Sequence, residues 1–114
     1  MGEIMVYWIT GRRHSGKTTL ARKLEKQIPN SVVLDGDEFR AYNNNQDYTD
    51  AGRRSNQEAL AKAAAQWEVL GKVPIIACVS PNKNLRKALQ ATFKSCLEIQ
   101  LPFGELWEGT TYEE

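Results

Sequence analysis

The segment that most constrains the fold is Gly11–Thr18, which reads Gly-Arg-Arg-His-Ser-Gly-Lys-Thr and matches the pattern G-x-x-x-x-G-K-[ST]. It follows Met5–Thr10, a continuously apolar run typical of a strand covered on both faces. It leads into Lys17–Ile28, an amphipathic helical pattern that ends before Pro29. In this context the loop's backbone N–H groups point at an anion, and the helix N-terminus adds partial positive charge. The sequence therefore predicts a phosphate-binding loop.

Beyond this loop, strand-like and helix-like segments continue to alternate. We expect strands at Ser31–Leu34, Val73–Val79 and 97–101, a helix at Asp50–Leu70, and a second helix with Ser80 as N-cap and Pro81 as first residue. Strands separated by helices imply right-handed crossovers and a parallel sheet, with the site at the carboxyl ends of the strands. The expected fold class is α/β, a P-loop NTPase three-layer α/β/α sandwich on about four parallel strands. Residues 1–114 are expected to form a single P-loop kinase-like domain.

The composition excludes some kinds of binding partner for this site. The 114 residues include 15 Lys+Arg and 14 Asp+Glu, a balance that argues against a nucleic-acid-binding surface. The apolar runs are too short to span a bilayer, and Glu3 stands where a signal peptide carries positive charge. Cys78 and Cys96 form neither a disulfide framework nor a metal-ligand pattern. We therefore expect a reduced, cytoplasmic protein that binds a small-molecule nucleotide, with no membrane or nucleic-acid partner; a homodimer is left open.

Each position of the loop has an expected part in holding ATP and Mg²⁺. The Lys17 ammonium would lie along the β- and γ-phosphates, and the Thr18 hydroxyl would be a ligand of Mg²⁺. The variable positions carry bulky side chains that either contact phosphates or point to solvent; solvent is favoured for His14, and both options stay open for the arginines. The predicted ATP-binding residues are Gly11, Arg12, Arg13, His14, Ser15, Gly16, Lys17, Thr18 and Thr19.

Other motifs separate this chain from GTPases and locate its carboxylates. Asn82-Lys83-Asn84-Leu85 begins like the guanine-reading N-K-x-D motif, but Leu85 stands where the aspartate must be. Ser80 occupies the place of the usual aspartate after the Val73–Val79 strand. Asp35-Gly36-Asp37 follows the Ser31–Leu34 strand instead, so that one carboxylate can contact the Mg²⁺ shell while the other accepts a proton from a substrate hydroxyl. A turn with a helix cap is the structural alternative for these two aspartates.

Several segments together resemble the adenylylsulfate (APS) kinase family. They are Tyr7–Gly11, Ser15–Ala21, Leu34–Asp37 with Arg40, and Ser80-Pro81 followed by Lys83 and Arg86. A D-R-x-E-N segment of the family is matched only at Arg53 and Asn56. The likeness covers roughly residues 5–101, and the Asp-Gly-Asp and Ser-Pro combination is more specific than the phosphate loop alone.

The resemblance implies transfer of the ATP γ-phosphoryl group to the 3′-hydroxyl of adenylyl sulfate, in sulfate activation. It implies catalytic residues Lys17, Asp37 and Ser80, and metal contacts from Thr18 and Asp37. It implies substrate binding by Asp35, Asp37, Arg40, Tyr48, Arg53 and Asn56, with Tyr48 in the place of an aromatic that stacks on the base. For Ser80, the family's phosphorylated serine, a helix N-cap is the alternative role.

The chain also departs from the family. The basic lid that family members carry after their last strand is missing between Leu101-Pro102 and the closing segment Trp107–Glu113. A lid of this kind covers the nucleotides and excludes water. Two alternatives to adenylyl sulfate kinase activity therefore stay open: a P-loop kinase for another nucleotide-like or hydroxyl acceptor, and a catalytically inactive ATP-binding module.

Overall fold

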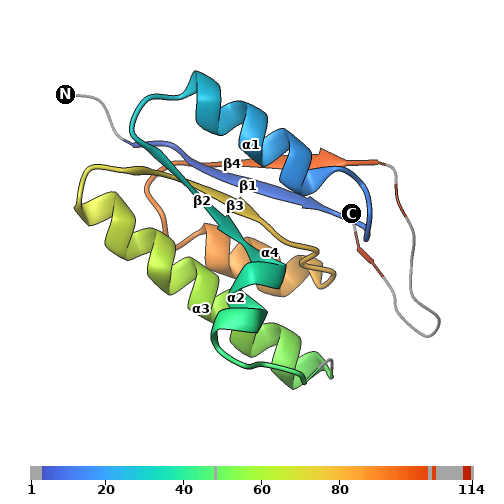
Figure 1. Cartoon of the computed structure of the whole chain (residues 1–114). Coiled ribbons are helices and arrows are strands. Elements are labelled where there is room, and N and C mark those ends of the chain that lie inside the picture. The colour runs from blue at the N-terminus through green and yellow to red at the C-terminus, as the bar shows by residue number, and fades with distance from the viewer. Residues whose placement is uncertain (1–3, 48, 103, 105–111, 114) are drawn as a thin grey trace.

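A computed structural model describes residues 4–47, 49–102, 104 and 112–113 of the chain (Figure 1). The elements, in chain order, are β1 (Val6–Gly11), α1 (Lys17–Gln27), β2 (Ser31–Asp35), α2 (Gly36–Tyr42), α3 (Asp50–Val69), β3 (Val73–Ala77), α4 (Lys83–Gln90) and β4 (Cys96–Leu101). No helix in these described stretches combines the length and the apolar character that crossing a membrane requires.

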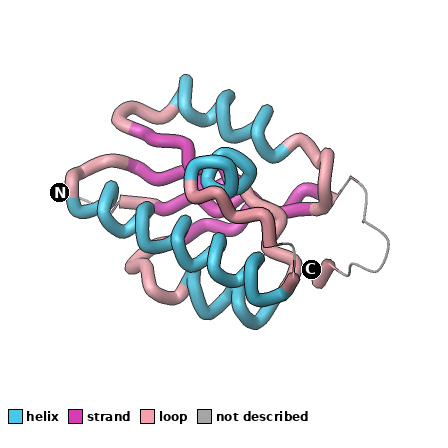
Figure 2. Tube along the Cα trace, turned by 60° about the horizontal axis from the view of Figure 1, so that its bottom comes forward, coloured by secondary structure: helices cyan, strands magenta, loops and turns pink. Residues whose placement is uncertain are grey.

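The four strands form one parallel sheet with the order β2-β3-β1-β4. Helix α1 covers one face of the sheet, and α2, α3 and α4 lie on the other (Figure 1). The tube view also shows helices on both sides of the strands (Figure 2). Because every strand runs the same way, the carboxyl ends of β1, β2 and β3 meet at one edge of the sheet. The predicted three-layer α/β/α architecture is confirmed.

Alternation along the two central strands divides the apolar core between the faces. Trp8, fully buried, points with Ile76 toward α3, where it meets Leu60. Ile9 and Ile75 point toward α1 and pack with Ala21 and its neighbours. Strands buried on both faces need continuous apolar runs, which explains why β1 and β3 showed no polar alternation in sequence.

The structure corrects the expected start of α4. Its N-cap is Asn82, whose side chain accepts a hydrogen bond from the Leu85 N–H at 2.9 Å, and the helix begins at Lys83. Ser80 is therefore not the N-cap, and Pro81 is not a helical residue. Ser80 instead has a φ of 47° and is 2% exposed, because its hydroxyl is hydrogen-bonded in the core.

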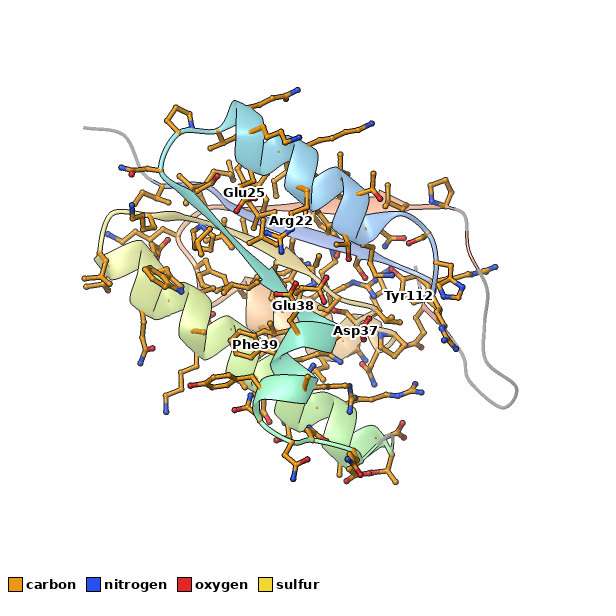
Figure 3. All side chains as sticks on the ribbon, in the orientation of Figure 1. Arg22, Glu25, Asp37, Glu38, Phe39 and Tyr112 are labelled. Carbon is orange, nitrogen blue, oxygen red and sulfur yellow. The ribbon has the colours of Figure 1, made fainter. Side chains whose placement is uncertain are left out.

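The short helix α2 was not predicted. It begins directly after β2, where the Asp35 side chain accepts hydrogen bonds from the N–H groups of Asp37 and Glu38. Seven residues are too few to show a helical period, so the cap was the only local signal for this helix. An ion pair between Arg22 and Glu38, at 3.2 Å, ties α1 to α2 (Figure 3).

Candidate active site

A cleft of about 870 Å³ opens at the carboxyl edge of the sheet. Its walls come from the β1–α1 loop, the start of α2, the first turns of α3 and the segment after β3. The predicted site residues that line it are Arg13, His14, Ser15, Gly16, Lys17, Thr18, Thr19, Asp35, Asp37, Arg40, Arg53, Asn56 and Ser80. Gly11 and Arg12 belong to the loop but are not part of the lining. Tyr48 lies outside the described residues.

The β1–α1 loop adopts the conformation that its glycines permit. Gly16 has a φ of 98° and immediately precedes α1, with no side-chain cap on the first N–H groups of that helix. His14 is also left-handed, with a φ of 60°, and its side chain is exposed on the cleft wall. A Cβ at Gly11 would lie 2.8 Å from the Ser15 Oγ and 3.0 Å from the Leu101 carbonyl oxygen, so a larger residue there would displace its neighbours. The uncapped N–H groups at this end of α1 are suited to binding an anion.

Lys17 lies over the loop that precedes it. Its Nζ donates to the Arg12 carbonyl oxygen at 2.8 Å and to the Ser15 Oγ at 3.4 Å. Burial lowers the pKa of this ammonium, while the negative charges of Asp37 and Asp35 act in the opposite direction. A flexible cation held by neutral oxygens at the cleft is positioned to exchange them for phosphate oxygens.

Thr18 and Asp35 form a hydrogen-bonded pair between the start of α1 and the end of β2. The Thr18 Oγ1 donates to the Asp35 Oδ2 at 2.7 Å, while the Asp35 Oδ1 caps α2. Asp35 is 6% exposed, whereas Asp37 is exposed at the start of α2 (Figure 3). Asp35 therefore caps a helix, which was the structural alternative, and also lines the cleft.

The opposite wall is built by α2 and α3. The Asn56 Nδ2 donates to the Gly36 carbonyl oxygen at 3.2 Å and so fixes α3 against the start of α2. Arg40 donates to the Asp47 carbonyl oxygen at 2.9 Å, which ties α2 to the chain before α3. Arg53 lies one turn before Asn56 on α3 and also lines the cleft.

Tyr112, which had no expected role in the site, lies at the cleft beside β1 (Figure 3). The Thr10 hydroxyl donates to the Val79 carbonyl oxygen at 2.7 Å, so the Tyr112 hydroxyl is the donor in its 2.8 Å hydrogen bond to Thr10. Burial raises the pKa of the Tyr112 phenol. This contact joins residues 102 positions apart, and no local pattern could have indicated it.

Arg86 of α4 connects the C-terminal segment to the sheet. Its side chain is fully buried and donates to the carbonyl oxygens of Ser80, at 2.6 Å, and Glu113, at 2.7 Å, and to the Glu98 Oε1 at 2.9 Å. Its guanidinium carbon lies 5.4 Å from the centre of the Tyr112 ring. Arg86 therefore holds Tyr112 and the segment after β3 in place.

The carboxylate of Glu98 is the charged partner of Arg86. Burial alone would raise the pKa of Glu98 above its ordinary value of 4.5. Hydrogen bonds from Gln90, Gln100 and Lys87, together with the positive charge of Arg86, lower it to about 2. Glu98 is therefore ionised in the folded protein at neutral pH.

Ser80 and Cys78 close the floor of the cleft toward the core. The Ser80 Oγ accepts a hydrogen bond from the Trp8 Nε1 at 3.1 Å and lies 2.7 Å from the Cys78 Sγ. Burial raises the pKa of the Cys78 thiol to about 11, so the thiol is protonated and unreactive at neutral pH. The Ser80 hydroxyl is thus engaged by core side chains.

A parallel sheet of this order, a G-x-x-x-x-G-K-T loop between β1 and α1, and carboxylates after β2 define a P-loop nucleotide-binding protein. The chain belongs to the adenylylsulphate kinase family, whose model matches residues 3–111. It is 33% identical over 96 residues to an adenylyl-sulfate kinase of Burkholderia ambifaria, a match that covers 80% of this chain and 53% of the relative. It is 30% identical over 102 residues to an adenylyl-sulfate kinase of Geotalea daltonii, with 85% and 50% covered.

Solved structures of other proteins are also similar to this chain. The structure of the Mycobacterium tuberculosis APS kinase CysC in complex with AMPPNP and APS is similar with a TM-score of 0.75 and 28% identity, over 89% of this chain and 64% of that one. The crystal structure of APE1195 is similar with a TM-score of 0.80 and 28% identity, over 90% and 63%. The chain spans about half the length of the curated relatives named above.

Proposed function

We propose that the protein is an ATP-dependent phosphotransferase that transfers the γ-phosphoryl group of ATP to the 3′-hydroxyl of adenylyl sulfate. Membership of the adenylylsulphate kinase family supports this, as does the similar CysC structure with AMPPNP and APS. The observation that carries the proposal is the pairing of Thr18 with Asp35 at 2.7 Å, which brings the phosphate loop and the carboxylates after β2 to one point. A small-molecule nucleotide fits this cleft.

On the donor side, residues 11–19 hold the ATP phosphates. The N–H groups at the start of α1 and the Lys17 ammonium would contact phosphate oxygens, and Lys17 would leave its two present partners to do so. Arg12, Arg13 and His14 are proposed phosphate contacts at the rim of the loop, with the solvent position of His14 as the alternative.

Mg²⁺ fits the oxygens of Thr18 and Asp35. A hydroxyl and a carboxylate are the hard oxygen ligands that Mg²⁺ prefers, and they lie 2.7 Å apart. Because Thr18 donates its proton to Asp35, its lone pairs are left to face a cation. The proposed metal contacts are therefore Thr18 and Asp35, and a metal contact from Asp37, which the family resemblance implies, stays a prediction. Bound Mg²⁺ would neutralise charge on the transferred group.

On the acceptor side, Asp37 is the proposed base. It is exposed at the cleft, so its carboxylate can reach a bound hydroxyl and accept the proton lost in transfer. Arg40 and Arg53 are proposed to bind the anionic groups of the substrate, and Asn56 is proposed to contact the ribose or base. The stacking role of Tyr48 and the cytoplasmic location stay predictions, and a homodimer stays open.

Ser80 is proposed to position the site without carrying the phosphoryl group. A phosphorylated serine needs an exposed hydroxyl and room for three oxygens, whereas Ser80 is 2% exposed and bonded to Trp8. Direct in-line transfer between two bound substrates requires no covalent intermediate.

The test is a coupled assay with ATP, Mg²⁺ and adenylyl sulfate, run on the wild type and on Asp37→Asn. Loss of a general base slows transfer by roughly 10²–10⁴-fold, while ATP affinity stays within a factor of about 2. The matched control is Glu38→Gln, which removes the neighbouring exposed carboxylate and its surface ion pair with Arg22 but should leave turnover unchanged. Absence of turnover in a folded wild type that binds ATP would show instead an ATP-binding module or a kinase for another acceptor.

A further inference from the structure

Two adjacent amides on α3 are buried at the cleft with unpaired oxygens. Asn56 is 6% exposed and Gln57 is 4% exposed, and both line the cleft. Within the described part of the chain, the Asn56 Oδ1 and the Gln57 Oε1 have no hydrogen-bond partner. The Asn56 orientation is fixed, because its Nδ2 must face the Gly36 carbonyl oxygen that it donates to. Its oxygen is therefore directed away from that carbonyl.

An unpaired buried oxygen requires an explanation, because nearly all buried polar groups in folded proteins have a partner. Packing in the core does not explain why a glutamine stands at position 57. The same face of α3 continues with Leu60, Ala61 and Ala64, which are buried and apolar, so an apolar side chain would satisfy the core at position 57 as well. The amide is therefore better explained by a ligand in the cleft than by the fold.

The charges along α3 indicate which part of a ligand would contact the amides of Asn56 and Gln57. Arg53 lies three residues before Asn56 and four before Gln57, which places all three on one side of the helix. Amide oxygens are partially negative, so a phosphate or sulfate is favoured beside the arginine and disfavoured beside the amides. A ligand that matches this order carries an anionic group next to a neutral group with N–H or O–H donors, as a nucleotide does.

We propose that Gln57 is a specificity-determining residue, which acts with Asn56 to accept hydrogen bonds from an N–H or O–H donor on the neutral part of the acceptor nucleotide. The proposal rests on the proposed function and deepens it, because it assigns the chemistry by which the acceptor is selected. A site with buried acceptors rejects a ligand that lacks the donor much more strongly than an apolar pocket rejects an extra group, because the acceptors are then left unpaired.

The experiment measures binding of three nucleotides by isothermal titration calorimetry, on protein saturated with AMPPNP and Mg²⁺ so that the ATP site is filled. AMP carries the base amino group and both ribose hydroxyls, IMP replaces the amino group with an oxygen, and 2′-deoxy-AMP lacks one hydroxyl. In the wild type we expect AMP to bind at least 10-fold more tightly than one of the two analogues. The analogue that is rejected identifies the donor.

The variants are Gln57→Met, which keeps the length of the side chain without polar atoms, and Gln57→Leu as a second apolar replacement. Both should reduce the preference for AMP to within about 3-fold and should melt no lower than the wild type, because no bond is lost on substitution. The matched control is Gln66→Met, an exposed glutamine on the same helix, which should keep the wild-type preference.

Two results overturn the proposal. If the folded Gln57→Met and Gln57→Leu variants keep the wild-type preference, Gln57 does not read the ligand, and the proposed function stands. If the wild type binds AMP and both analogues equally, no donor is selected other than the 3′-hydroxyl, which the proposed function already assigns to Asp37, and the proposal fails. Failure of AMPPNP itself to bind is a different result, because it refutes the proposed function at the phosphate loop.

Discussion

Replacing Arg86 with methionine tests how strongly one buried guanidinium stabilises the fold around the cleft. Methionine keeps most of the volume of the arginine stem but none of its donors. The three groups that Arg86 now satisfies are the carbonyl oxygens of Ser80 and Glu113 and the Glu98 carboxylate, at 2.6, 2.7 and 2.9 Å. All of them would lose a charged donor at once.

The expected cost is about 3–5 kcal/mol of unfolding free energy, the range found when one partner of a buried ion pair is removed. Domains of this size are stable by only about 5–15 kcal/mol, so the loss would be a large fraction of the total. Lys87→Met is the matched control. Its Nζ lies 3.2 Å from the same Glu98 oxygen, but the Lys87 side chain is 51% exposed and that of Arg86 is 0% exposed. Water replaces an exposed partner, so this change should cost less than about 1 kcal/mol.

The assay is urea unfolding followed by far-ultraviolet circular dichroism, with tryptophan fluorescence, to which the buried Trp8 contributes beside two other tryptophans, as a second probe. Trp8 donates to Ser80, whose carbonyl oxygen accepts from Arg86, so the indole lies next to the perturbed segment. We expect burial to make the Arg86–Glu98 ion pair contribute strongly to the free energy of unfolding. Equal losses of unfolding free energy in the two variants, or a loss below about 1 kcal/mol for Arg86→Met, would refute this expectation.

Three further predictions concern single residues. Lys17→Ala should lower kcat/KM by about 100-fold or more with little change in melting temperature, because one electrostatic contact to the transition state contributes roughly 3 kcal/mol; unchanged turnover would contradict the phosphate assignment. Ser80→Ala should cost about 1–3 kcal/mol of stability by leaving the Trp8 N–H unpaired, while turnover per folded molecule persists; abolished turnover in folded protein would indicate a phosphoryl carrier after all. The pKa of Glu98, lowered from 4.5 to about 2 on folding, implies a stabilisation that is complete above pH 4.5 and lost as the pH falls toward 2. Acid unfolding of Glu98→Gln should therefore show a flatter stability profile than the wild type in that window, and parallel profiles would contradict the assignment.

The architecture was predictable because its signals are local. The apolar run of β1, the loop at residues 11–18 and the amphipathic pattern of α1 follow one another directly, and together they imply a parallel sheet. The errors fall where a local signal competes with a distant partner. Ser80 precedes a proline and so matches an N-cap pattern, but the indole of Trp8, 72 residues away, binds its hydroxyl, and Asn82 caps α4 instead.

In the candidate site too, some residues could be predicted from local motifs and others could not. Lys17, Thr18 and the two aspartates after β2 could be placed from motifs, because the ends of parallel strands meet at one edge. Which of the aspartates pairs with Thr18 depends on side-chain geometry, and the structure gives that place to Asp35. Tyr112 could not be placed, because its position depends on Thr10 and Arg86, which belong to separate elements.

The two walls of the cleft therefore differ in how far the family resemblance describes them. The wall formed by residues 13–18, the proposed phosphate site, presents backbone N–H groups and a lysine, whose chemistry is the same for any nucleoside triphosphate. The α3 wall presents side chains, and here Arg53 and Asn56, which match the family motif, lie beside the buried amide of Gln57. Because a buried unpaired acceptor discriminates between ligands that share the same anionic groups, differences in acceptor preference within the family should map to this wall and not to the loop.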